Sequence, residues 1–243
     1  MPAETIFLII AAPFIGSFLG LVARRLPQGR ALVTGRSACE TCGRKLKPAE
    51  LIPFVSYLAQ RGRCACGKVR LSLFYPVIEF LALIVVLMAL PVRTGTLLCI
   101  SAALGWTLLI LAAIDQDSYI LPDRLTLPLI AAGLALTWWF SPGVLGDHVI
   151  GAVAGFVALT TINLLYRRLR GHDGLGGGDA KLLAAAGAWL GWAALPQVLL
   201  IAALTAVSAT MIGMLAGKVF HGCSRIAFGP YLTLGFWLVW LVG

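Results

Sequence analysis

The chain has 243 residues, of which 60% are apolar and only 12% are charged, and its mean hydropathy is +0.93. These values exclude an ordinary soluble globular protein and indicate a polytopic membrane protein. The formal net charge of +9 would also suit a nucleic-acid-binding protein, but no basic stripe interleaved with aromatic residues is visible. We therefore expect the basic residues to set the membrane topology and to attract anionic lipid, and we expect no nucleic-acid partner.

Apolar segments long enough to cross a bilayer recur along the chain. A hydrocarbon core about 30 Å thick needs roughly 20 apolar residues per helix, or a little fewer. Such segments lie near residues 4–23, 75–92, 95–114, 125–141, 147–166, 179–195, 197–217 and 227–242. The sequence predicts an all-α polytopic membrane protein with about eight transmembrane helices. The first of them is expected to be retained, because the residues before it lack the positive charge of a signal peptide.

The distribution of lysine and arginine predicts the orientation of these helices. If the N-terminus lies outside, the cytoplasmic segments are 24–74, 115–124, 167–178 and 218–226. Eighteen of the 19 Lys and Arg residues then lie in or beside a cytoplasmic segment, and only Arg93 lies on the other side. This asymmetry follows the positive-inside rule, and it predicts that both termini face away from the cytoplasm.

Four cysteines lie in the predicted cytoplasmic segment 24–74. Cys39 and Cys42 form a C-x-x-C pair, and Cys64 and Cys66 form a C-x-C pair. Thiolates in two short turns can supply the four tetrahedral ligands of Zn²⁺, and disulfides are not expected in a reducing compartment. The sequence predicts a small zinc-ribbon-like loop. Four incidental thiols remain the alternative, since the second pair is one residue shorter than usual.

Two acidic residues stand at the ends of apolar segments on the predicted cytoplasmic side. Asp115 ends the third segment, and Asp179 begins the sixth, directly after Gly176 and Gly178. Glycines there allow a polypeptide to approach the backbone and a helix to begin. Close carboxylates share one proton, so the ionised acid can activate water while its protonated partner donates to the peptide oxygen. This is the minimum equipment of an intramembrane aspartyl protease.

Other charged residues near these segments have simpler interpretations. Glu79 lies about one turn inside an apolar segment, so it is either a functional residue or the partner of a loop cation. Asp123 follows a proline and is predicted to be the N-cap of the fourth helix. Lys181 either adds to the electrostatic field at the acids or extends to the lipid headgroups.

Two long motifs and several short ones run in order through nearly the whole chain. They are Asp115-x-x-x-x-Ile120-Leu121-Pro122-Asp123-x-Leu125-Thr126-Leu127-Pro128, Gly176-x-Gly178-Asp179-x-Lys181-Leu182-Leu183, Gly16-Ser17-Phe18, Arg25-Leu26-Pro27, the Cys39/Cys42 pair, Ile52-Pro53-x-x-Ser56-Tyr57, Tyr75-Pro76-x-x-Glu79 and Phe228-Gly229-Pro230-Tyr231. This pattern resembles the bacterial prepilin peptidases, or type IV leader peptidases, which are GxGD aspartyl proteases of type IV pilus and type II secretion systems.

The resemblance implies a function for each part of the chain. Asp115 and Asp179 would be the catalytic pair, and the substrates would be prepilins or pseudopilins, cut after the glycine of a short basic leader. Many members also methylate the new N-terminus with S-adenosylmethionine. No nucleotide-binding fingerprint for that cofactor is visible, so this expectation rests on resemblance alone. The location implied is the bacterial cytoplasmic (inner) membrane, with periplasmic termini.

Three regions are predicted on this basis: a first transmembrane helix (1–23), a cytoplasmic Cys-rich loop associated with methyl transfer (24–74) and a transmembrane aspartyl protease core (75–243). The chain departs from the family pattern at Gly20 and Leu51, where asparagine is frequent. Two alternatives belong to other classes: a proton-coupled membrane transporter that uses the two buried acids, and a non-catalytic membrane scaffold with a zinc ribbon.

Overall fold

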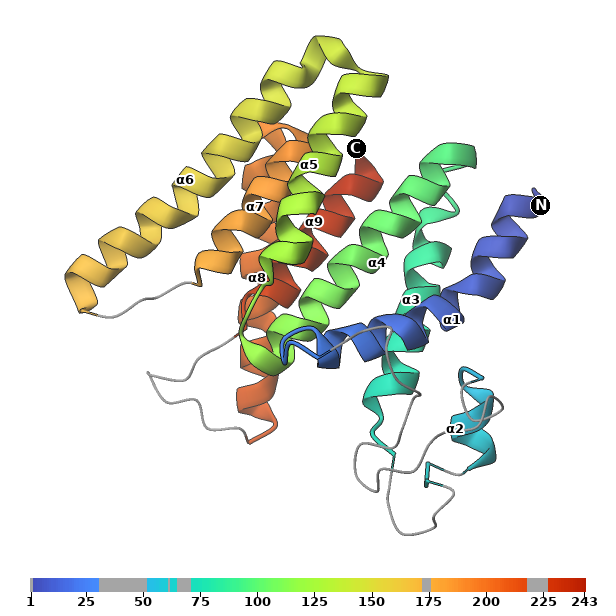
Figure 1. Cartoon of the computed structure of the whole chain (residues 1–243). Coiled ribbons are helices and arrows are strands. Elements are labelled where there is room, and N and C mark those ends of the chain that lie inside the picture. Colours follow the sequence, from blue (N-terminus) through green and yellow to red (C-terminus); the bar gives the residue numbers. More distant parts are fainter. Residues whose placement is uncertain (1, 31–51, 61, 65–70, 172–175, 218–226) are drawn as a thin grey trace. The chain divides into compact units, whose positions relative to one another are not determined.

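Figure 1 shows the computed structural model of the chain, which describes residues 2–30, 52–60, 62–64, 71–171, 176–217 and 227–243. The regular structure in this part is helical. The helices are α1 (Ala3–Arg25), α2 (Val55–Ala59), α3 (Phe74–Ala89), α4 (Gly95–Ser118), α5 (Asp123–Phe140), α6 (Leu145–Arg170), α7 (Gly177–Leu190), α8 (Leu195–Leu215) and α9 (Gly229–Val242), with short 3-10 turns η2 (Pro142–Val144) and η3 (Trp192–Ala194). Each predicted apolar segment contains one of these helices, which confirms the all-α prediction.

Four described segments are long and apolar enough to cross a membrane. They are Ala3–Arg25, Gly95–Ser118, Pro142–Arg170 and Trp192–Leu215. Helices α3 and α9 are also apolar, but they are shorter. The structure is therefore compatible with a membrane protein, and the total of eight crossings remains a prediction. The short helix α2 was not predicted, because it lies in the segment for which the sequence indicated only a loop.

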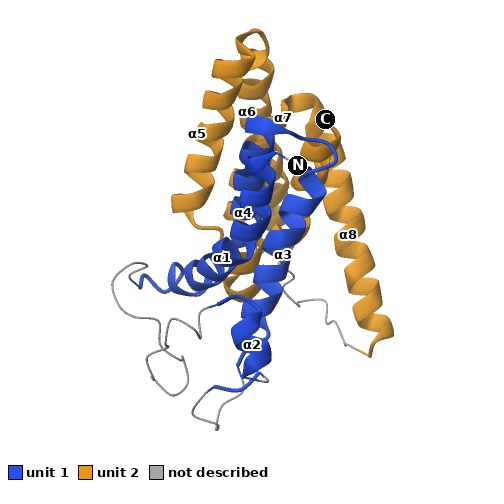
Figure 2. Cartoon of the chain, turned by 90° about the vertical axis from the view of Figure 1, so that its right-hand side faces the viewer, with its two compact units in different colours: residues 1–110 blue, residues 111–243 orange. Residues whose placement is uncertain are grey.

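The chain divides into two compact units, residues 1–110 and 111–243, which Figure 2 colours separately. In the first unit, α1 packs against α3. A Cβ atom at Gly16 would lie 2.6 Å from the Cα of Glu79, and one at Gly20 would lie 3.0 Å from the side chain of Ile78. Glycine is needed at Gly16 because the two helix backbones approach so closely there.

Helix α7 is the central element of the second unit. It contacts α5, α6 and α9, while α8 packs against α9 (Figure 1). Every residue from Asp179 to Trp189 except Lys181 is buried. The helix is rich in Gly and Ala, and a Cβ at Gly155 of α6 would lie 2.6 Å from the carbonyl oxygen of Leu183. Small residues allow this close helix packing, as in many membrane helix pairs.

Both ends of α7 are set by glycines. Gly176 precedes the helix in an extended conformation, and Gly191 ends it with φ of +79°, a left-handed conformation that favours glycine. The sequence predicted an apolar segment from 179 to 195, whereas the helix ends at Leu190. Asp179 therefore lies in the first turn of a short, deeply packed helix.

Candidate active site

Asp115 and Asp179 lie in the same unit and come together from different helices. Asp115 belongs to the last turn of α4, and Asp179 belongs to the first turn of α7. Each residue is only 6% exposed, and the two carboxylates interact electrostatically. The structure thus brings two buried acids close enough to influence each other electrostatically.

Asp179 caps the helix on which it lies. Its Oδ2 accepts a hydrogen bond from the backbone N–H of Gly176 at 3.2 Å. The N–H of Asp179 in turn donates to the carbonyl oxygen of Gly176 at 3.1 Å. This pair of hydrogen bonds fixes the carboxylate at the N-terminus of α7, where the helix dipole stabilises a negative charge.

Asp115 lies at the N-terminus of another helix, α9. Its Oδ2 accepts a hydrogen bond from the backbone N–H of Gly229 at 2.9 Å. Gly229 is the first residue of α9 and the next residue, Pro230, has no N–H, so Asp115 satisfies one of the unpaired donors of this helix. A Cβ at Gly229 would lie 2.6 Å from Oδ2 of Asp115, so the contact requires glycine at this position.

The two carboxylates share three features. Each is buried, each accepts one backbone N–H through Oδ2, and each lies at a helix N-terminus. Asp115 also lies in the last turn of α4, at the negative end of that helix dipole, so the helix dipoles favour a negative charge on Asp179 more than on Asp115. No hydrogen bond joins Oδ1 of either acid to a residue that the structure describes.

The glycines before Asp179 differ in their surroundings. A Cβ at Gly178 would lie 2.7 Å from the Cβ of Leu121, so Gly178 is required for packing inside the protein rather than for access of a substrate. Gly176 is exposed, and the position of a Cβ at Gly177 meets open space. The exposed glycines are thus Gly176 and Gly177, and the expectation that Gly176 and Gly178 together admit a substrate remains a prediction.

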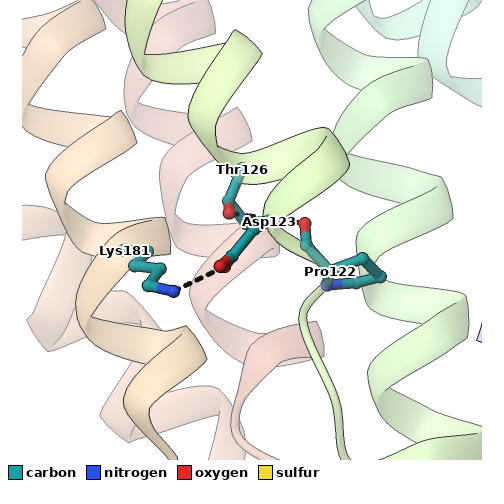
Figure 3. A network of polar contacts seen from close by, with 4 residues as sticks. All are labelled: Pro122, Asp123, Thr126 and Lys181. Carbon is teal, nitrogen blue, oxygen red and sulfur yellow. Dashed lines mark hydrogen bonds and ion pairs between the residues drawn. The ribbon is translucent and has the colours of Figure 1, made fainter.

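The prediction that Asp123 caps the fourth helix is wrong. The N-cap of α5 is Pro122, with φ of −67° and ψ of 133°, and no side chain caps this helix. Asp123 is the first helical residue, and its Oδ1 forms an ion pair with Nζ of Lys181 (Figure 3). Proline already sets the backbone angle at the helix start, so the carboxylate is free to bind the lysine.

Lys181 forms this ion pair with a side chain that is only partly exposed. The two interpretations of Lys181, a contribution to the electrostatic field at the acids or an extension to the headgroups, both remain predictions. The pair joins the first residue of α5 to the fifth residue of α7 (Figure 3). The ion pair thus links α5 to α7 two residues after Asp179.

Glu79 is a buried acid of the first unit. It is 6% exposed, and its Oε2 accepts the backbone N–H of Phe54 at 3.0 Å, with a further hydrogen bond to the side chain of Ser17. Phe54 has φ of 57°, an unusual value for a residue other than glycine. Among the described residues, the partner of Glu79 is this backbone N–H and not the predicted loop cation. Glu79 therefore anchors the segment around Phe54 to α3.

Only one of the four predicted zinc ligands can be placed. Cys64 is buried, whereas Cys39, Cys42 and Cys66 lie outside the described residues. Within the described ranges, no three His, Cys, Asp or Glu residues group in a way that could hold a metal ion. The structure gives no support to the zinc-ribbon prediction, which remains a prediction.

Sequence reasoning missed the contact of Gly229 with Asp115. The two residues are 114 positions apart, and no local pattern joins them. The available signal was the Phe228-Gly229-Pro230-Tyr231 motif, in which glycine and proline mark a helix start. The motif acts through a tertiary contact, because the start of α9 lies beside the end of α4.

Comparisons with known proteins agree with this arrangement. Residues 10–92 match the family model of the bacterial peptidase A24 N-terminal domain, and residues 102–211 match that of the type IV leader peptidase family. A protein of Aeromonas hydrophila named prepilin leader peptidase/N-methyltransferase is 39% identical, over 94% of this chain and 87% of its own length. Proteins of the same name from Burkholderia pseudomallei (strain 1026b) and Pseudomonas aeruginosa are 40% and 34% identical, over 94% and 97% of this chain and 82% and 89% of their own lengths.

No solved structure matches the chain. The family models nevertheless cover most of its length, and the named relatives are matched over more than four-fifths of theirs. The motifs that carry the resemblance also converge in the structure, since the Asp115, Asp179 and Gly229 motifs meet at one place. The chain belongs to the type IV leader peptidase family.

Proposed function

We propose that this chain is a prepilin leader peptidase and that Asp115 and Asp179 carry out the cleavage. The observation that carries this proposal is the meeting of two buried carboxylates, each held by the backbone N–H of a glycine. The names of the relatives support prepilins as the substrates. A transporter is not favoured, because the family to which the chain belongs is a peptidase family.

The reaction needs one proton shared between the two acids. The ionised carboxylate removes a proton from water, and the water oxygen attacks the carbonyl carbon of the peptide bond while the protonated acid donates to the carbonyl oxygen. The resulting diol collapses: the C–N bond breaks, one acid delivers a proton to the leaving amine, and the other regains its proton from the diol. Both acids then return to their starting state.

The substrate is a prepilin or pseudopilin cut after the glycine of its leader, at the cytoplasmic face of the bacterial inner membrane. The excess of Lys and Arg in the predicted cytoplasmic segments supports this orientation, with both termini periplasmic. Exposed apolar side chains along the long helices support contact with the lipid bilayer, for example Val157 on α6 and Leu204 on α8. A reporter fused near Arg168 should read cytoplasmic and one near Gly143 periplasmic; the opposite labelling would contradict the topology.

The chain also transfers a methyl group from S-adenosylmethionine to the new N-terminal amine. This part of the proposal rests on the names of the relatives and on the match of residues 10–92 to the N-terminal domain of the family.

We assign zinc a purely structural role in the cytoplasmic loop, on Cys39, Cys42, Cys64 and Cys66, because thiolates suit Zn²⁺. Metal analysis of the purified protein should find about one equivalent, and Cys39→Ser should lose it.

The decisive experiment uses detergent-purified protein and a prepilin. Wild-type protein should give the shortened pilin, and Asp179→Asn should give none. Methylation is a separate reaction, so Asp179→Asn should still methylate a pilin that has already been cut. Substantial cleavage by Asp179→Asn would contradict the catalytic role of the aspartate pair. The absence of any product from the wild type would contradict the peptidase function.

A further inference from the structure

The segment that joins α4 to α5 runs directly beside the two acids. It comprises Tyr119–Pro122 and begins four residues after Asp115. Leu121 of this segment is buried, and its Cβ packs against Gly178, the residue before Asp179. The segment is therefore fixed to both helices that carry the carboxylates.

The backbone of this segment is held at its ends and unpaired between them. The N–H of Tyr119 donates to the carbonyl oxygen of Asp115 at 2.9 Å, and the carbonyl oxygen of Pro122 accepts from Leu125 and Thr126 at the start of α5. The N–H and C=O groups of Ile120 and Leu121 form no hydrogen bond with any residue in the described ranges. Backbone outside helices whose N–H and C=O groups are unpaired can form hydrogen bonds with an added strand.

Tyr119 has an unusual conformation for its residue type. Its φ is +55°, in the left-handed region where helices usually end in glycine. A bulky side chain there is strained, and strain of this kind gathers at ligand-binding and active sites. The Tyr119 side chain is 53% exposed and that of the next residue, Ile120, is 54% exposed. If this residue served only to end α4, glycine would do so without the backbone strain, so the tyrosine side chain indicates a further role.

The neighbouring α7 start is open. Gly176 and Gly177 are exposed, and a side chain at Gly177 would meet open space. The buried acids therefore lie next to two features: an edge of unpaired backbone with exposed apolar side chains, and a backbone without side chains. An extended peptide has the shape and chemistry to lie along both.

We propose that Tyr119–Pro122 is the docking edge for the scissile segment of the substrate. The extended peptide pairs with the backbone at Ile120 and Leu121, and its apolar residues next to the cut bond contact the side chains of Tyr119 and Ile120. This inference rests on the proposed peptidase function. The occupant is an extended segment because a peptide bond inside a helix has its carbonyl engaged, whereas the carboxylates must reach that oxygen from the side.

Tyr119→Gly tests the role of the side chain, because it removes both the strain and the apolar contact. The thermal midpoint should stay the same or rise, while KM for a prepilin should rise about tenfold, equivalent to about 1.4 kcal/mol of binding. Trp139→Ala is the matched control, since Trp139 is an exposed aromatic residue near the other end of α5, and its KM should match the wild type. Ile120→Ser, which changes an exposed side chain, should raise KM by a smaller factor without unfolding the protein.

Synthetic substrates test the backbone pairing independently. Esters that replace single amides around the cut bond remove one N–H at a time, and paired strands use alternate residues, so KM should rise at every second position. If the wild type does not cut the unmodified peptide, the peptidase function fails and the docking edge fails with it. If the wild type cuts it, but Tyr119→Gly and Ile120→Ser retain the wild-type KM and the ester series is flat, the docking edge alone is overturned.

Discussion

The two units bury their carboxylates to the same degree but differ in how these carboxylates are arranged. Glu79 in the first unit and the Asp115–Asp179 pair in the second are all 6% exposed, and all accept a backbone N–H. The donor to Glu79 comes from a strained loop residue, Phe54, and a hydroxyl adds a second bond. The donors to the two aspartates are glycines at helix starts, and each aspartate also faces the other.

The comparison shows that burial of an acid does not by itself identify a catalytic residue. A single buried carboxylate with neutral donors can hold a loop against a helix. Two carboxylates that interact have one proton between them, which gives an acid and a base in one place. Substitutions should therefore separate anchoring from chemistry.

The largest difference should appear when each acid is changed to its amide. Asp115→Asn or Asp179→Asn keeps the shape of the side chain and one hydrogen-bond acceptor but removes the titrating group, so prepilin cleavage should fall by about 10²–10⁴-fold or more. The double variant should be no worse than either single one, because residues that act as a unit are not additive. Glu79→Gln should retain cleavage. Comparable losses in all three single variants, measured as product formed per enzyme, would contradict the distinction.

Gly229→Ala should give the next largest effect. The added Cβ would lie 2.6 Å from Oδ2 of Asp115, so the carboxylate or the start of α9 must move. Misplacement of a catalytic group by about 1 Å can cost about 10²-fold in rate, and we expect a loss in kcat of that order. Gly146→Ala is the control, since a Cβ there meets nothing within 4 Å. Wild-type cleavage by Gly229→Ala would show that this hydrogen bond does not position Asp115.

Helix placement was predictable from the sequence, whereas the contacts between helices were not. Apolar runs located the eight longer helices because lipid-compatible segments must be continuous. The position of Asp115 and Asp179 at segment ends also followed from the sequence. The Asp123–Lys181 pair did not, because these residues are 58 positions apart and a local rule assigned Asp123 to helix capping.

The removal of Glu79 as an acceptor should affect stability more than cleavage. Glu79→Leu leaves the partly buried N–H of Phe54 without its acceptor, and we expect the free energy of unfolding to fall by about 1 kcal/mol. A lower thermal midpoint and faster proteolysis between residues 24 and 74 would report this loss. Prepilin cleavage by the folded fraction should be retained. An unchanged midpoint would contradict the anchoring role, and Glu79→Gln, which keeps an acceptor, is the matched comparison.

The smallest effect should come from the exposed ion pair beside the site. Asp123→Asn and Lys181→Met should each lower the free energy of unfolding only slightly. Their coupling energy in a double-mutant cycle should be about 0.2–1 kcal/mol, as for other exposed pairs. The coupling should weaken at high salt. A coupling energy well above this range, or loss of cleavage in Asp123→Asn, would place the pair in the catalytic machinery.

The two helices that begin beside the acids are also short, which affects hydration. Helices α7 and α9 have 14 residues each. At 1.5 Å per residue each is about 21 Å long, less than a hydrocarbon layer of about 30 Å. Around such helices the bilayer thins or polar groups reach inward. Water, the second substrate of a hydrolase, then has less hydrocarbon to cross on its way to the carboxylates.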